Sequence, residues 1–186
     1  MSVRMRAFAT ALALAMLLLV PTSPRPVAAA SAKELNRESS AALVKLYEKS
    51  QPARLLRDHA KAVLVFPDMY KAGFLFGGQI GEGVLLRGGK PVAYYNSVAA
   101  SYGLQAGAQR FGYALFFMNE KALEYLDKSE GFELGVGPSI VIVEAGMGKS
   151  MTSTTLTQDV YAFIFDQQGL MAGIGIQGSK ITRISK

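Results

Sequence analysis

The sequence predicts an α+β fold in a single domain, with N-terminal helices packed on a strongly curved, mainly antiparallel, glycine-rich β-sheet that is barrel-like. Three observations predict it. Apolar residues recur at helical spacing over residues 33–49. Most of the chain beyond residue 62 is apolar and strand-like, with short connections that favour antiparallel pairing. Glycines inside these strand-like segments indicate bulges and bends, which curve a sheet.

Two helices are predicted near the N-terminus and one in the middle of the chain. Residues 33–49 form an amphipathic pattern, with apolar residues on one face and lysines and arginines elsewhere. Pro52 is predicted at the first position of a second, short helix, where its missing N–H costs nothing. Asn119 is predicted to cap a third helix, which Gly131 stops.

Several segments are predicted to be β-strands. Residues 63–66 and 112–118 are apolar at every position, which implies burial on both faces of the sheet. The first of these runs is expected to end at Pro67–Asp68, and the Gly-Gly-Lys-Pro sequence of residues 88–91 is expected to be a turn between two strands. Further strands are expected at residues 139–143, 160–165, 170–176 and 180–184, with a hairpin turn at residues 166–169.

The segment from Ala62 to Leu86 contains an unusually dense cluster of glycines. We expect Gly77, Gly78, Gly81 and Gly83 to serve backbone geometry and not chemistry. A cluster of this kind in apolar strand sequence indicates bends or close contacts that a Cβ atom would obstruct.

The N-terminal residues have the pattern of a signal peptide. A short segment with two arginines precedes an apolar run over residues 7–20, which is short for a membrane span of roughly 20 residues. Three alanines, residues 28–30, provide the small side chains that a signal peptidase accepts. We expect a signal peptide of residues 1–30, a domain of residues 31–186, and a periplasmic or secreted product. An uncleaved N-terminal anchor is the alternative.

Composition argues against several classes of function. Removal of residues 1–30 takes away three arginines and no acid, so the net charge falls from +6 to +3. That charge is too mild to indicate nucleic-acid binding, which uses dense basic patches. The chain has no cysteine and a single histidine, His59, so a zinc site or a Cys–His nucleophile is not expected. The carboxylates are scattered along the sequence, and we expect no enzyme activity, no metal and no cofactor.

Two short glycine motifs resemble nucleotide-binding sequences but lack their context. Residues 173–178 match GxGxxG, yet strand-like sequence follows where the dinucleotide motif needs a helix. Residues 146–150, Gly-Met-Gly-Lys-Ser, resemble the end of a P-loop, but Val143 occupies the position of its first glycine. We interpret both as glycine turns.

Three blocks of sequence carry a resemblance to a known family. They contain, in order, Pro67, Lys71, Gly73, Gly77, Gly78, Gly81 and Gly83; Gly103, Gly107, Gln109 and Asn119; and Gly169, Ala172, Gly173 and Gly178. This ordered set resembles the SYLF domain family over nearly all of residues 31–186. The resemblance implies binding of phosphoinositides and other phospholipids and, in fungal members, actin regulation. Many members have a tryptophan before the second block; this chain has none, and Tyr94 and Tyr95 are the nearest aromatic residues.

The predicted function is an exported, non-enzymatic domain that binds anionic phospholipid at a membrane surface. The resemblance implies the lipid, and a basic amphipathic helix can hold cations near lipid phosphates, although its apolar face can instead pack on the sheet. The candidate lipid-binding residues are Lys33, Arg37, Lys45, Lys49, Arg54, Arg57 and Lys71. The alternative is an envelope module that binds a protein partner by sheet-edge addition. The actin link is not carried over to an exported protein.

Overall fold

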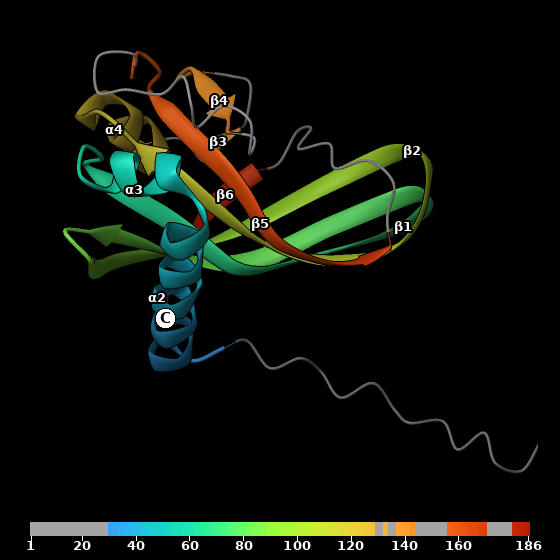
Figure 1. Cartoon of the computed structure of the whole chain (residues 1–186). Coiled ribbons are helices and arrows are strands. Elements are labelled where there is room, and N and C mark those ends of the chain that lie inside the picture. The colour runs from blue at the N-terminus through green and yellow to red at the C-terminus, as the bar shows by residue number, and fades with distance from the viewer. Residues whose placement is uncertain (1–29, 129–131, 134–136, 144–155, 171–179) are drawn as a thin grey trace, which may run out of the picture.

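A computed structural model describes residues 30–128, 132–133, 137–143, 156–170 and 180–186, and it confirms the predicted α+β fold. N-terminal helices pack on one strongly curved, mainly antiparallel sheet that curls into a half-barrel (Figure 1). The helices are α2 (Ala32–Lys49), α3 (Gln51–Arg57) and α4 (Glu120–Lys128). The strands are β1 (Ala62–Arg87), β2 (Lys90–Phe117), β3 (Phe132–Glu133), β4 (Ile140–Ile142), β5 (Val160–Leu170) and β6 (Lys180–Ile184).

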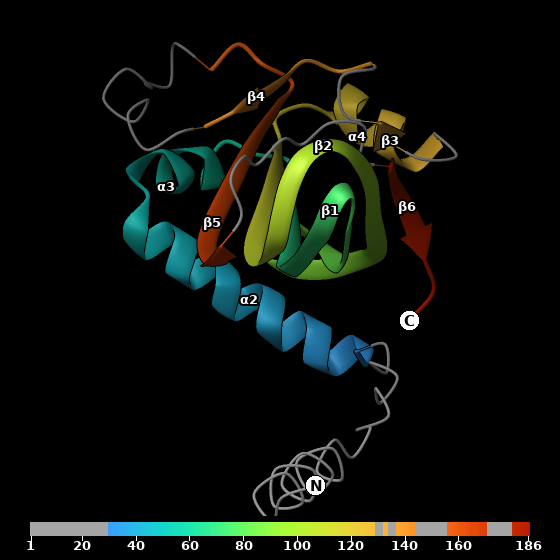
Figure 2. The same ribbon diagram turned by 90° about the vertical axis from the view of Figure 1, so that its right-hand side faces the viewer.

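A long hairpin of β1 and β2 is the centre of the sheet. Its turn is Gly88–Gly89, and both residues have positive φ, +57° and +76°, as a two-residue type I′ turn requires. The strand β2 pairs with β1 along one edge and with β5 and β6 along the other. The strand β3 pairs with β6, and β4 pairs with β5 in the one parallel pairing among the described strands. In Figure 2 the strands β1 and β2 form nested arches.

Two predicted strand ends are wrong, because β-bulges occupy those positions. One extra residue of β1 lies between Phe66 and Met69 at Pro67–Asp68, and β1 continues to Arg87. Likewise, residues 166–169 do not reverse the chain: Asp166 has φ of +50° and β5 continues past it to Leu170. Proline, aspartate and glycine suit bulges as well as turns, since bulges also interrupt the ladder or need unusual φ.

The two faces of the sheet carry different cores. The inner face, on the concave side, holds the core that α4 covers, with Phe66, Tyr95 and Leu115 among its residues. The outer face holds the core that α2 and α3 cover. Alternate residues of β1 and β2 enter the two cores, which confirms the predicted burial of residues 63–66 on both faces. Residues 112–117 are confirmed in the same way as the last part of β2, whereas Met118 follows the strand and is half-buried.

The strand β1 folds back so that its inner face meets itself, and glycines make this possible. A Cβ atom on Gly81 would lie 2.8 Å from the Asp68 carbonyl oxygen, and one on Gly83 would lie 2.6 Å from that of Val65. The expectation of a geometric role is therefore confirmed for these two glycines. It is wrong for Gly78, on the outer face, where a Cβ atom would enter open space.

Ser31 and Asn119 cap helices through their side chains, and the cap at Asn119 was predicted. The Ser31 hydroxyl accepts a hydrogen bond from the Glu34 N–H at 3.2 Å, and α2 begins at Ala32. Asn119 caps α4 by accepting from the Ala122 N–H at 2.9 Å. Residues 180–184 form β6, as predicted. Several predictions concern residues outside the described ranges. They are the signal peptide except for Ala30, the helix stop at Gly131, the glycine motifs at 146–150 and 173–178, and the part of the predicted strand 170–176 that follows Leu170.

Candidate functional site

The helix α2 is docked on the sheet by its apolar face. Leu35, Ala42, Leu43 and Leu46 are buried and belong to the outer core. Tyr94 of β2 fixes the helix further, because its hydroxyl oxygen accepts a hydrogen bond from the Asn36 side chain at 3.1 Å. The face that could insert into a membrane is thus occupied in this structure, and the exposed faces of α2 are mainly polar and charged, with Val44 as an exposed apolar residue.

The basic residues of α2 fall into two groups. With about 100° of rotation per residue, Lys33 and Arg37 project opposite the buried stripe, and both are exposed. Lys45 and Lys49 are turned from them by about 120° toward one flank of the helix. Arg37 lies 3.9 Å from Glu38, a distance that leaves its guanidinium, on a side chain 75 % exposed, open to other anions. The first pair is therefore the group of predicted residues best placed to meet a flat anionic surface.

Lys45 and Lys49 face a polar groove between α2 and the two bulges of the sheet. The Lys49 ammonium binds the Asp166 carboxylate at 2.6 Å. Asp68, at the bulge in β1, accepts from Arg110 of β2, and the ion pair raises the pKa of that guanidinium. Lys45 lines this groove of about 190 Å³ together with Glu38. Because acids and bases alternate along the groove, Lys49 is committed to holding α2 on the sheet.

The two arginines of α3 have structural partners. Arg54 donates to the carbonyl oxygens of Tyr47 and Glu48, at the last turn of α2. Arg57 donates to Asp58 at 2.9 Å, which raises the arginine pKa and lowers that of the carboxyl group. The Arg57 guanidinium also lies 5.4 Å from the centre of the Tyr47 ring. Burial raises the pKa of Tyr47 to about 12 despite the opposing effect of Arg57.

Lys71 lies apart from the other predicted basic residues, and the two tyrosines that are the nearest aromatic residues to the second block have partners within the fold. Lys71 is on the inner face, only 2 % exposed and in register with Gln109. It is separated from α2 by the sheet, so the structure does not bring it together with the other six basic residues. Tyr94 holds Asn36, as described above, and the Tyr95 hydroxyl donates to Asp127 at 2.8 Å. Both tyrosines therefore stabilise the fold.

Three titratable residues that could in principle serve catalysis, Asp159, Glu82 and His59, contact other groups of the protein. Asp159 accepts from Asn119 and from the Ser139 N–H and hydroxyl, and these hydrogen bonds lower the pKa of its carboxyl group. Glu82 binds Lys186 at 2.7 Å. The exposed His59 ring contacts the Leu55 carbonyl oxygen. In the described part of the chain, no group of three or more His, Cys, Asp or Glu residues is placed to hold a metal ion.

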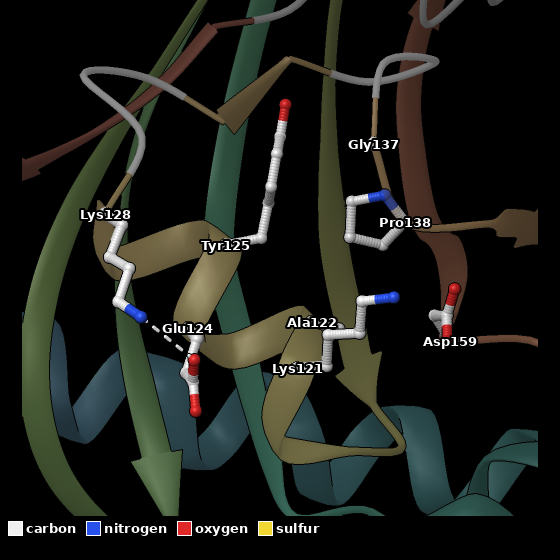
Figure 3. Close-up of a pocket in the computed structure, with 8 residues that line it drawn as sticks. All are labelled: Lys121, Ala122, Glu124, Tyr125, Lys128, Gly137, Pro138 and Asp159. Atoms are coloured by element: carbon white, nitrogen blue, oxygen red, sulfur yellow. Dashed lines mark hydrogen bonds and ion pairs between the residues drawn. The ribbon is translucent and has the colours of Figure 1, made fainter.

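A pocket of about 550 Å³ lies beside α4 (Figure 3). Ala122, Tyr125 and Pro138 give it apolar walls. Its rim carries Lys121 and Asp159, together with the Glu124–Lys128 ion pair at 3.0 Å that Figure 3 marks. Two lysines and two acids balance at this rim, so the pocket has no charge preference for an anionic ligand.

Sequence comparison identifies the C-terminal half of this structure. Residues 98–186 match the family model described as Ysc84, Las17-binding protein actin regulator. These residues are similar to the Ysc84, or SYLF, family. The match begins within β2 and includes α4, β5 and β6. It confirms the resemblance for the second and third sequence blocks, while the first block lies before the matched range. No curated protein matches this chain.

The SYLF match indicates a binding or regulatory module and no known class of enzyme. All seven predicted lipid-binding residues lie before residue 98, so the match assigns no role to any of them. Sequence reasoning did not find the groove between α2 and the bulges. Its carboxylates, Asp68 and Asp166, lie in the segments for which the sequence predicts a strand end and a turn. No helix in the described part of the chain is long and apolar enough to cross a membrane.

Proposed function

We propose that this protein is an exported, non-enzymatic SYLF protein that binds anionic phospholipid through the outward face of α2. The observation that carries the proposal is the position of Lys33 and Arg37, exposed and opposite the buried stripe while the helix stays docked. Lys45 lies at the flank of the same surface. Each cation near an anionic membrane contributes on the order of 1 kcal/mol, so several together produce measurable binding.

The docked helix predicts how this binding responds to salt. Contact through exposed ammonium and guanidinium groups is electrostatic and is screened within a Debye length of about 8 Å at physiological ionic strength. We therefore expect the protein to sediment with vesicles that contain phosphatidylglycerol in low salt, and much less with phosphatidylcholine vesicles. High salt is expected to weaken the binding.

The decisive experiment changes Lys33, Arg37, Lys45 and Lys49 together to Gln. We expect vesicle binding to be lost while the fold remains, because exposed charges contribute little to stability. A matched variant changes the exposed Lys61, Lys90, Lys121 and Lys128 to Gln, which removes the same charge elsewhere. Lys49→Gln alone separates loss of the Asp166 ion pair from loss of membrane contact. Equal binding by the two quadruple variants in low salt would leave α2 purely structural.

Export is the second part of the proposal. The pattern of residues 1–30 supports cleavage before Ser31, and the Ser31 side chain caps α2. Cleavage there would leave the first turn of the helix intact. N-terminal sequencing of the protein from the cell envelope or medium tests this. If the protein kept Met1 and were found in the membrane fraction, it would be a membrane-anchored protein and not a periplasmic or secreted one.

One observation favours a second candidate, binding of a protein partner by strand addition. Among the described strands, β1 has a neighbour on one edge only, and it is 26 residues long. An edge of this kind offers backbone donors and acceptors to an added strand. Such binding would not depend on lipid or on the basic residues of α2. Retained partner binding by the α2 quadruple variant, without vesicles, would favour it.

A further inference from the structure

On the outer face of the β1–β2 hairpin, the core that α2 covers contains residues from the start of β1, such as Val63, and from near the hairpin turn, such as Val84. Strand register aligns Val84, Tyr94 and Ile184 in one row, and Tyr94 contacts α2. Glu82 lies in the next row and binds the Lys186 ammonium at 2.7 Å. The same ammonium donates to the Ala30 carbonyl oxygen at 2.8 Å. Since Ala30 lies just before α2, the helix begins beside this row.

The outer face continues past the start of α2 as an exposed apolar surface. We call Phe76, Gly78, Ile80, Val98 and Ala100 the hairpin patch. Phe76 is 72 %, Ile80 56 % and Val98 46 % exposed, and Ile80 lies directly opposite Val98. Gly78 and Ala100 form the adjacent exposed pair. The residues that alternate with them, Gln79 and Ser97, are buried on the inner face, so the patch residues project outward.

The charges around the hairpin patch are complementary to an anionic lipid surface. Lys180 of β6 is exposed and lies in register with Val98, so one row reads Ile80, Val98, Lys180. The adjoining row contains one carboxylate, Glu82, and Lys186 already neutralises it. An apolar surface bordered by an exposed ammonium can bury its side chains below the headgroups while the lysine reaches the phosphates.

We propose that the hairpin patch inserts into the headgroup region of an anionic bilayer, with Lys180 at the lipid phosphates. This inference rests on the proposed function and deepens it, because it adds an apolar anchor to the electrostatic contact of α2. The two surfaces lie on the same side of the sheet. Lys186 links them, because its ammonium binds both Ala30, just before α2, and Glu82 of β1. Burial of apolar side chains is not screened by salt, so the patch supplies binding that persists when the α2 contacts weaken.

The absence of tryptophan from the chain permits a direct test. Phe76→Trp places a single reporter in the patch, and Val92→Trp places one at a residue that is 50 % exposed near the hairpin turn, outside the patch. With vesicles of phosphatidylglycerol and phosphatidylcholine, we expect a blue shift and quenching by brominated acyl chains for Phe76→Trp only. An unchanged Phe76→Trp spectrum on vesicle-bound protein would overturn the proposal. A blue shift that grows with protein concentration without vesicles would also overturn it, in favour of a protein interface.

A second pair of variants measures the contribution of the patch. Val98→Asp is expected to weaken binding to the same vesicles about ten-fold in moderate salt, since a charge replaces a side chain that would be buried. Val92→Asp, with the same change on the same strand, is expected to bind like the wild type. Equal binding by wild type and Val98→Asp overturns the patch but leaves the proposed function. Absence of wild-type binding to anionic vesicles overturns both.

Discussion

The inner and outer faces of the β1–β2 hairpin share one backbone but differ in what their side chains meet. On the inner face, β1 approaches itself so closely that Gly81 and Gly83 have no room for a Cβ atom. On the outer face, Gly78 adjoins open space and Ile80 is exposed. The difference shows that the meaning of a glycine in a strand depends on the face it belongs to. The inner glycines allow the strand to bend back, and the outer surface is left available for binding.

The largest expected effect comes from adding a side chain on each face. Gly81→Val forces its Cβ against the Asp68 carbonyl oxygen and the Met69 side chain, and backbone cannot move aside cheaply. We expect a loss of about 3 kcal/mol or more in the free energy of unfolding, at the upper end for overpacked sites. Gly78→Val is expected to cost nothing and to gain slightly, because valine suits a strand better than glycine. Urea unfolding of both variants provides the measurement.

An equal loss of stability in the two glycine variants would remove the distinction between the faces. It would mean that the bend of β1 depends on flexibility along the whole segment and not on close approach at particular residues. Gly83→Val provides a second inner position, since its Cβ would lie 2.6 Å from a Phe66 ring carbon and from the Val65 carbonyl oxygen.

A smaller effect distinguishes two tyrosines within the inner face. The Tyr95 hydroxyl donates to Asp127 at 2.8 Å, whereas the Tyr113 hydroxyl is buried and has no hydrogen-bond partner among the described residues. Burial raises the pKa of both, so both stay neutral. We expect Tyr95→Phe to cost about 1 kcal/mol, and Tyr113→Phe to be neutral or slightly stabilising. Thermal unfolding measures both, and a clear loss in Tyr113→Phe would show that its hydroxyl is bonded in solution.

Much of this fold could be predicted because local chemistry decides it. Asn119 caps a helix through its own side chain, and Gly88–Gly89 supplies the two positive φ values of a tight hairpin. The bulges could not be predicted, since Pro67–Asp68 and residues 166–169 carry the same residue types that turns use. Only pairing with β2, far away in sequence, decides that these strands continue.

The candidate site could be predicted only in part. The amphipathic pattern of residues 33–49 identified α2 and its basic residues, but not which of them the sheet engages. Lys49 pairs with Asp166, a residue 117 positions away, and Lys71 is buried on the opposite face of the sheet. The hairpin patch was not predicted either, because apolar strand sequence reads as core until the position of the covering helix is known.

The smallest expected effect concerns how the outer face is held at the edge of the patch. Lys186 and Glu82 lie 2.7 Å apart with side chains 8 % and 29 % exposed, while Arg87 and Glu120 form a 3.0 Å pair with both side chains more than half exposed. Partial burial reduces screening, and Glu82→Gln leaves the enclosed Lys186 ammonium without its counter-charge. We expect Glu82→Gln to cost about 1 kcal/mol of unfolding free energy and Glu120→Gln less than about 0.5 kcal/mol. Urea unfolding in low and high salt measures both. If both variants lost the same unfolding free energy, and if high salt removed that loss, the Glu82–Lys186 contact would be as solvated as an ordinary surface pair. It would then not fix the start of α2 beside the patch.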